Sequence, residues 1–144
     1  MFLSDVTDRG ATPALVQSLV FQEARLRMIA ENVANAETPG YRAKQLDVLG
    51  FQQALGAALE TRGRSPQKPL VIENGRELRT DESGGLRVVP SVKPIDNVLF
   101  HDGTNVSIER EMADLAETGL AQQLATTLLR DRMAGLRKAI RGTV

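Results

Sequence analysis

The chain has 144 residues, enough for one domain with one modest core. Its 18 Lys and Arg residues balance 18 Asp and Glu residues, which removes the usual electrostatic reason to expect a nucleic acid or an anionic membrane as partner. Aromatic residues make up 3% and there are no cysteines, so disulfides and thiolate chemistry are excluded and aliphatic helix packing is favoured.

The N-terminal residues carry Asp5, Asp8 and Arg9 and do not have the basic and then apolar order of a cleavable secretory signal. The longest uncharged apolar stretch runs from about Ala11 to Gln22, which is too short to span a membrane. We therefore expect a soluble protein, either cytosolic or exported by a route that needs no such signal.

The first predicted element is a helix over residues 12–35. Thr12 is the expected N-cap and Pro13 the first helical residue, where its missing N–H costs nothing. Apolar positions alternate at spacings of four and three, the seam of a heptad repeat. This N-terminal seam consists of Leu15, Leu19, Gln22, Leu26, Ile29 and Val33.

Residues 36–106 form a less regular middle region. Val48 to Leu59 is expected to be a short helix, and residues 61–69 to be an exposed linker. Asn74-Gly75 is a strong hairpin-turn signal, and the short runs 70–72 and 77–79 flank it.

Leu86 to Val89 is expected as an edge strand that Pro90 ends.

A second long helix is predicted over residues 107–141, with Ser107 as N-cap and Gly142 after its end. It repeats the alternation of four and three. This C-terminal seam consists of Ile108, Met112, Leu115, Gly119, Gln122, Thr126, Leu129, Met133, Leu136 and Ile140. Its middle is weak, because three small or polar residues replace large apolar ones there.

These elements predict a mainly α fold in a single domain, residues 1–144. The two long terminal helices form a coiled-coil-like hairpin, and the small irregular middle contains a β-hairpin. A middle region of this size cannot cover both seams. Another copy or another protein should therefore cover part of them, which indicates an assembly protein.

Catalytic chemistry finds little support. His101, the only histidine, lies beside Asp102 without a Ser or Cys arrangement that resembles a nucleophile and its base. We expect no catalytic, cofactor-binding or metal site, and hence no enzyme and no cofactor. The basic end of the chain, which includes Arg137, Lys138 and Arg141, has no interleaved aromatic residues and does not predict nucleic-acid binding.

Residues 32–41, with the sequence NVANAETPGY, end the first helix and begin a tight turn. Pro39 fixes φ at the second turn position, and Gly40 permits the positive φ that a type II turn needs at the third. Asn32 and Asn35 are placed to bond free carbonyls or a neighbouring chain. On these residues alone, a helix stop remains the simplest interpretation.

The segment Ala34 to Tyr41 (ANAETPGY) after an amphipathic helix resembles the N-terminal motif of the flagellar axial family of rod, hook and hook-associated proteins. Asp102 to Met112 (DGTNVSIEREM) looks like the DGNNVDxExEM stretch of the proximal rod protein B type within the bacterial flagellar basal-body rod family. Thr104 and Ser107 depart from the commoner Asn and Asp. The resemblance covers roughly residues 12–49 and 102–141.

This resemblance implies a structural subunit of the proximal rod, which assembles by helix packing, transmits torque and encloses the export channel. It implies type III export without a cleaved signal peptide, to the basal-body rod in the periplasmic space. The implied partners are further copies, other rod proteins and the rod–ring junction protein, with no nucleic acid and no membrane insertion. A coiled-coil adaptor or secretion chaperone, and a small nucleic-acid-binding helical protein, are the alternatives.

The expected assembly interface combines the two seams with the turn. Its residues are Leu15, Leu19, Leu26, Ile29, Asn32, Val33, Asn35, Thr38, Pro39, Gly40, Tyr41, Ile108, Met112, Leu115, Leu129, Met133, Leu136 and Ile140.

Overall fold

The computed structural model describes residues 10–64, 68–81, 85–94 and 106–142. Along the chain the elements are α2 (Thr12–Ala34), β1 (Lys44–Gln45), α3 (Val48–Gly63), β2 (Leu78–Thr80), β3 (Leu86–Val88), β4 (Ser91–Val92) and α4 (Ile108–Arg141). His101 and the first residues of the second motif, 102–105, lie outside the described residues.

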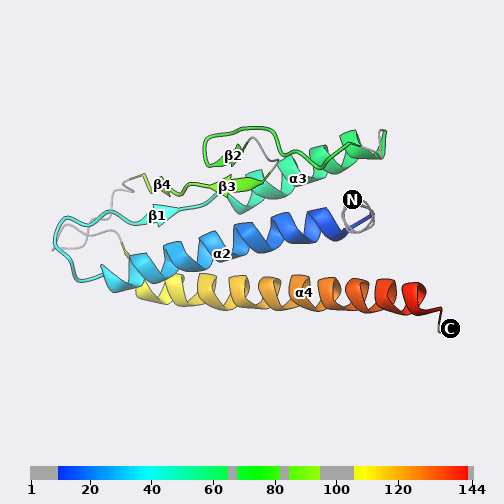
Figure 1. Cartoon of the computed structure of the whole chain (residues 1–144). Coiled ribbons are helices and arrows are strands. Elements are labelled where there is room, and N and C mark those ends of the chain that lie inside the picture. Colours follow the sequence, from blue (N-terminus) through cyan, green and yellow to red (C-terminus); the bar gives the residue numbers. More distant parts are fainter. Residues whose placement is uncertain (1–9, 65–67, 82–84, 95–105, 143–144) are drawn as a thin grey trace.

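Helix α2 lies between the other layers of the molecule (Figure 1). The long helix α4 runs antiparallel along one side of it, and α3 with the short strands covers another side. This arrangement confirms the predicted mainly α fold, with paired terminal helices and small antiparallel strands in the middle. Among the described residues, no helix combines the length and the apolar character that a membrane span requires.

The apolar core lies between α2 and the middle region. The Phe21 ring of α2 stacks on the Phe51 ring of α3, with centroids 4.1 Å apart and an interplanar angle of 4°. Ala58, Leu70 and Ile72 are buried in the same cluster. Since two aromatic rings bury more apolar area than any aliphatic pair here, this stack anchors the middle region to α2.

The strands form two antiparallel pairs, β1 with β4 and β2 with β3. The hairpin predicted around Asn74-Gly75 is wrong, because residues 70–72 are described and form no strand and β2 pairs with residues 86–88 instead. Side chains close the Asn74 turn: Asn74 Oδ1 accepts from Thr80 N at 2.7 Å, and Thr80 Oγ1 donates to Ile72 O at 2.6 Å. The Thr80 N–H on one edge of β2 thus bonds a side chain and not a neighbouring strand, and β2 pairs with residues 86–88.

The helix ends differ in part from expectation. Helix α2 has Ala11 at its N-cap, and Thr12 lies buried inside the first turn, so Thr12 is not the cap. Ser107 is the N-cap residue of α4 as predicted, although its hydroxyl contacts Glu109 at 3.2 Å rather than the backbone.

Two further ends follow the local sequence closely. Gly142 ends α4 with a φ of 65°, a left-handed value that favours glycine. Helix α3 starts at an Asp47 cap, whose Oδ1 accepts from Gly50 N at 2.8 Å, and it continues to Gly63. Residues 61–63 are therefore helical, and the predicted linker begins later than expected.

Phe51→Ala should lower the free energy of unfolding by about 3–5 kcal/mol, because it removes one ring of the stack and leaves a cavity against Phe21. Urea denaturation followed by circular dichroism measures the change. Leu49→Ala is the matched control on the same helix, since Leu49 is 69% exposed, and should change the value by about 0.5 kcal/mol or less. Equal effects of the two substitutions would contradict this assignment of the core.

Candidate assembly interface

The face that α4 turns towards α2 is not the predicted seam. The buried residues of α4 are Glu111, Thr118 and Ala125. Each stands one position before a predicted seam residue, namely Met112, Gly119 and Thr126. The heptad spacing is therefore correct, but the phase of the buried face is displaced by one residue, or about 100° around the helix.

Helix α2 shows a similar displacement. Phe21, Arg25, Met28 and Asn32 are buried, each one position before the predicted Gln22, Leu26, Ile29 and Val33. Ile29 is also buried, as predicted. The helix thus uses a face centred on aromatic and polar residues, while the leucines of the predicted seam lie along its margin.

The predicted interface residues fall into three groups by burial. Ile29 and Asn32 are buried within the chain. Half-buried are Leu15, Leu19, Leu26, Val33, Asn35, Tyr41, Leu129, Met133 and Leu136. Exposed are Thr38, Pro39, Gly40, Ile108, Met112, Leu115 and Ile140. The exposed group therefore comes from the turn after α2 and from α4.

Arg25 links α2 to α4 through charge. Its side chain is 8% exposed, and Nη2 donates to Asp114 Oδ1 and to Glu117 Oε2 at 3.1 Å each. Both carboxylates are more exposed, at 40% and 65%, so water screens part of the attraction. Loss of either partner matters most for Arg25 itself, since a guanidinium this deeply covered is costly to leave unpaired.

Asn32 is a second polar link and is 0% exposed. Its Nδ2 donates to Lys44 O at 2.9 Å and to Glu111 Oε2 at 3.2 Å. Its Oδ1 accepts from Lys44 N at 2.9 Å and from the Tyr41 hydroxyl at 3.0 Å. An asparagine side chain has two donor hydrogens and two acceptor sites, so every hydrogen-bonding position of Asn32 is used. The Asn32 side chain thereby links α2 to Tyr41 and Lys44, which follow it in the chain, and to Glu111 in the first turn of α4.

Three titratable groups near Asn32 have raised pKa values. Burial raises the pKa of the Glu111 carboxyl, the hydrogen bond from Asn32 opposes the shift, and nearby Asp114 adds to it. Burial and the neighbouring Glu31 raise the pKa of Tyr41. Lys44 pairs with Glu31, and their hydrogen bond raises the lysine pKa. The cluster thus holds one carboxyl, Glu111, whose charged form is disfavoured by its surroundings.

The turn at residues 38–41 is attached to α2 by the hydrogen bond from the Tyr41 hydroxyl to Asn32, and its residues 38–40 are exposed to solvent. Tyr41 N donates to Thr38 O at 3.1 Å and Gly40 has a φ of 75°, as expected of the predicted type II turn. Asn35 Nδ2 donates to Glu31 O at 2.8 Å and helps to end the helix. The tip of the turn is exposed, and a Cβ at Gly40 would meet nothing within 4 Å.

Within the part of the chain that the structure describes, helix α4 displays large apolar side chains that stay exposed. Ile108, Met112 and Leu115 are 47%, 44% and 38% exposed. We call these three residues the α4 edge. A second row, Leu120, Leu124 and Leu128, is 69%, 61% and 47% exposed. Large apolar side chains are therefore repeated along the exposed surface of α4.

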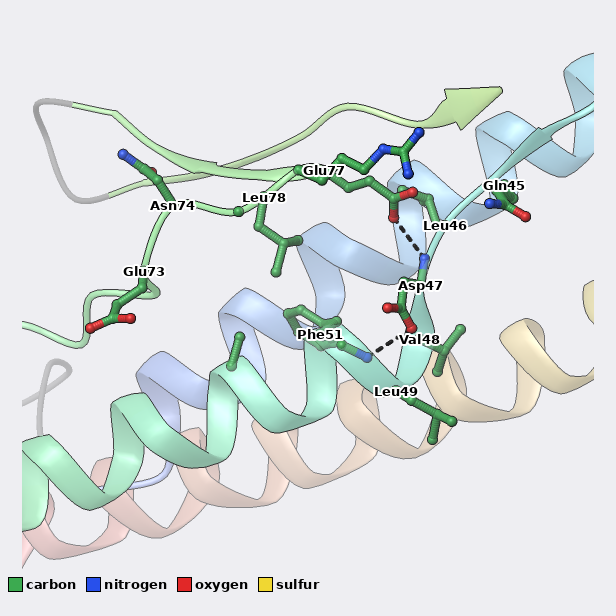
Figure 2. Close-up of a pocket in the computed structure, with 14 residues that line it drawn as sticks. Gln45, Leu46, Asp47, Val48, Leu49, Phe51, Glu73, Asn74, Glu77 and Leu78 are labelled. Carbon is green, nitrogen blue, oxygen red and sulfur yellow. Dashed lines mark hydrogen bonds between the residues drawn. The ribbon is translucent and has the colours of Figure 1, made fainter. Parts of the chain in front are cut away.

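A groove near the start of α3 offers no comparable chemistry. It has a volume of about 720 Å³ and lies between the first turns of α3 and residues 73–78 (Figure 2). Two of the three carboxylates that line it are occupied: Glu77 accepts from Asp47 N at 2.7 Å and also contacts Ser91, while Asp47 caps α3. Within the described residues, no group of His, Cys, Asp and Glu is placed to hold a metal ion.

Sequence reasoning missed Arg25 and Glu111, because both are charged residues at buried positions. A signal was nevertheless present. The other long helix carries two acidic residues, Asp114 and Glu117, about one turn apart, and these complement the charge of Arg25. A search for apolar positions alone does not detect such a match of opposite charges.

Asn32→Asp should lower the free energy of unfolding by about 3 kcal/mol, because it removes both Nδ2 donors and adds a negative charge beside Glu111. Denaturant titration at neutral pH measures the loss. Asn74→Asp is the control, since the Asn74 Oδ1 that accepts from Thr80 N is retained in an aspartate. A loss no larger than that of the control would contradict the role of Asn32.

Glu111→Gln should flatten the dependence of stability on pH. The folded-state pKa of Glu111 is raised, so its contribution is fully present below the unfolded value of about 4.3 and is lost as pH rises through the folded value. Glutamine keeps an acceptor for Asn32 and does not titrate. The variant should therefore gain stability relative to the parent as the pH rises above the unfolded value of about 4.3, whereas the exposed control Glu109→Gln should not. Parallel profiles for parent and Glu111→Gln would refute the assignment.

The chain is similar in sequence to known proteins, both around the turn after α2 and over most of its length. Residues 19–42, which include most of α2 and the turn, match the family model for the flagella basal body rod protein. The chain is 31% identical over 129 residues to the flagellar basal body rod protein FlgB of Cereibacter sphaeroides, covering 88% of this chain and 90% of that protein. It is 26% identical to the proteins of the same name from Aeromonas hydrophila, over 125 residues, and from Salmonella typhimurium, over 133 residues. These two alignments cover 87% and 88% of this chain, and 88% and 89% of those proteins. The chain therefore belongs to the FlgB family of flagellar basal body rod proteins.

Proposed function

We propose that the chain is a structural subunit of the proximal rod of the flagellar basal body, where it helps to transmit torque and to enclose the export channel. The carrying observation is the α4 edge, three large apolar side chains left exposed beside a polar contact with α2. Family membership supports the rod as its place. A subunit of this kind acts by packing, and we propose no catalytic role and no cofactor.

Its partners in this proposal are further copies of the same chain, the other rod proteins and the rod–ring junction protein. The half-buried leucines of α2 and the α4 edge supply the apolar area for these contacts, and the turn at residues 38–41 sets the orientation against a neighbour. We propose export through the flagellar type III apparatus without cleavage of a signal peptide, and a final position in the periplasmic part of the basal body.

Leu115→Asp should abolish rod assembly while leaving the isolated protein folded. Leu115 is 38% exposed, so an aspartate there costs the monomer about 1 kcal/mol or less, yet it places a charge in the proposed contact. Swimming and recovery of the chain in purified basal bodies, in a deletion strain that carries the variant, measure assembly.

Leu59→Asp is the matched control, since Leu59 is 39% exposed on α3. It should leave both readouts close to those of the parent. Normal swimming with Leu115→Asp would contradict the proposed interface. Recovery of the parent chain only in soluble complexes, and its absence from basal bodies, would instead support an adaptor or secretion chaperone.

A further inference from the structure

The sequence of α4 allows two orientations of this helix against α2. In one, the predicted seam faces inward and the α4 edge packs on α2. In the other, which the structure adopts, the neighbouring positions face inward: Thr118 is 0% and Glu111 4% exposed, while Met112 is 44% exposed. Hydrophobic burial alone favours the first orientation, because it would remove more apolar area from water.

Polar contacts at two positions along the α2–α4 pair favour the observed orientation instead. Arg25 Nη2 reaches Asp114 and Glu117 at 3.1 Å, and one turn earlier along α4 Asn32 Nδ2 reaches Glu111 at 3.2 Å. Rotation of α4 by one residue would carry these carboxylates away from α2. Arg25 would then be a covered guanidinium without its partners, and Asn32 would lose a donor contact at a fully buried site.

The two positions also fix the rotation more tightly than either does alone. Glu111 and Asp114 are three residues apart, so they lie about 60° from each other around α4 and on the side that faces α2, and Arg25 reaches the next residue at this spacing, Glu117, as well. A helix pinned at two points along the same side cannot turn about its axis without breaking both contacts.

We propose that Arg25 and Asn32 are the positioning residues that set the rotation of α4, holding the α4 edge outward so that a helix of a neighbouring rod subunit packs on it. The use of that edge rests on the proposed function. The rotation itself does not, because it is a property of the isolated chain. Buried polar contacts thus select an orientation that is poorer for the monomer's own apolar packing and competent for assembly.

Cysteine accessibility in the purified monomer tests the rotation, and the chain has no cysteine of its own to interfere. Single cysteines are introduced as Met112→Cys or Thr118→Cys, and their rates of alkylation are compared. In the parent background the first should react fast and the second slowly. In the triple-substituted background Arg25→Met, Glu111→Met and Asp114→Leu, α4 should rotate so that position 112 becomes buried and position 118 becomes exposed. We therefore expect the ratio of the alkylation rate at position 112 to that at position 118 to fall by about tenfold or more.

Arg27→Met is the matched control, because Arg27 is 78% exposed and pairs with Glu23 on the surface of the same helix. It should leave the ratio unchanged. An unchanged ratio in the triple-substituted background would overturn the proposal, since apolar packing would then set the rotation by itself.

A second series guards against loss of folding in that background. Arg25→Glu alone sets like charges against Asp114 and Glu117 and should lower the ratio, whereas Arg25→Glu combined with Asp114→Arg and Glu117→Arg should restore it. Failure of Arg25→Glu to lower the ratio, or of the reversed pair to restore it, would also overturn the proposal. If the rotation changes as expected but a strain with the triple substitution swims normally, the proposed use of the α4 edge is wrong, while the positioning role of the polar contacts stands.

Discussion

Asn32 has two donor hydrogens and two acceptor sites, and its side chain is fully shielded from water. Under those conditions every unmade hydrogen bond is costly, so the chain must bring four partners to one point. The backbone of Lys44 supplies two of them, the Tyr41 hydroxyl a third and Glu111 the fourth. The return of the chain after α2, the outward position of the 38–41 turn and the seating of the first turns of α4 all depend on this requirement.

Two sides of α2 consequently make two different kinds of contact, apolar packing with the middle region and polar contacts with α4. Apolar packing, centred on the stacked rings of Phe21 and Phe51, holds the middle region. Charge and hydrogen bonds hold the N-terminal half of α4, with Arg25 and Asn32 as the buried groups on α2. Because the second contact uses little apolar surface, the large side chains of that half of α4 stay available to a neighbour.

Much of this fold is legible in the sequence. Period and end signals predict both long helices, and Pro39 with Gly40 predicts the turn that follows α2. The predicted phase of the helix pair is displaced by one residue, because an apolar pattern assigns Arg25 and Glu111 to the surface and takes no account of the partners that make their burial acceptable. The predicted strand at residues 86–89 is present, but its pairing was not predicted: the Asn74 side chain bonds Thr80 N, residues 70–72 form no strand, and β2 pairs with residues 86–88. Specific side-chain bonds, rather than propensity, decided both cases.

We propose that polar contacts within one subunit hold α4 with its apolar edge directed at the next subunit. A high-resolution electron cryomicroscopy map of assembled rods that contain this chain tests it most directly. We expect that Arg25 still contacts Asp114 and Glu117, that Asn32 still contacts Glu111, and that Met112 and Leu115 touch a helix of an adjacent subunit. A map in which Met112 and Leu115 pack on α2 of their own chain, with Arg25 and Glu111 turned to solvent, would contradict it.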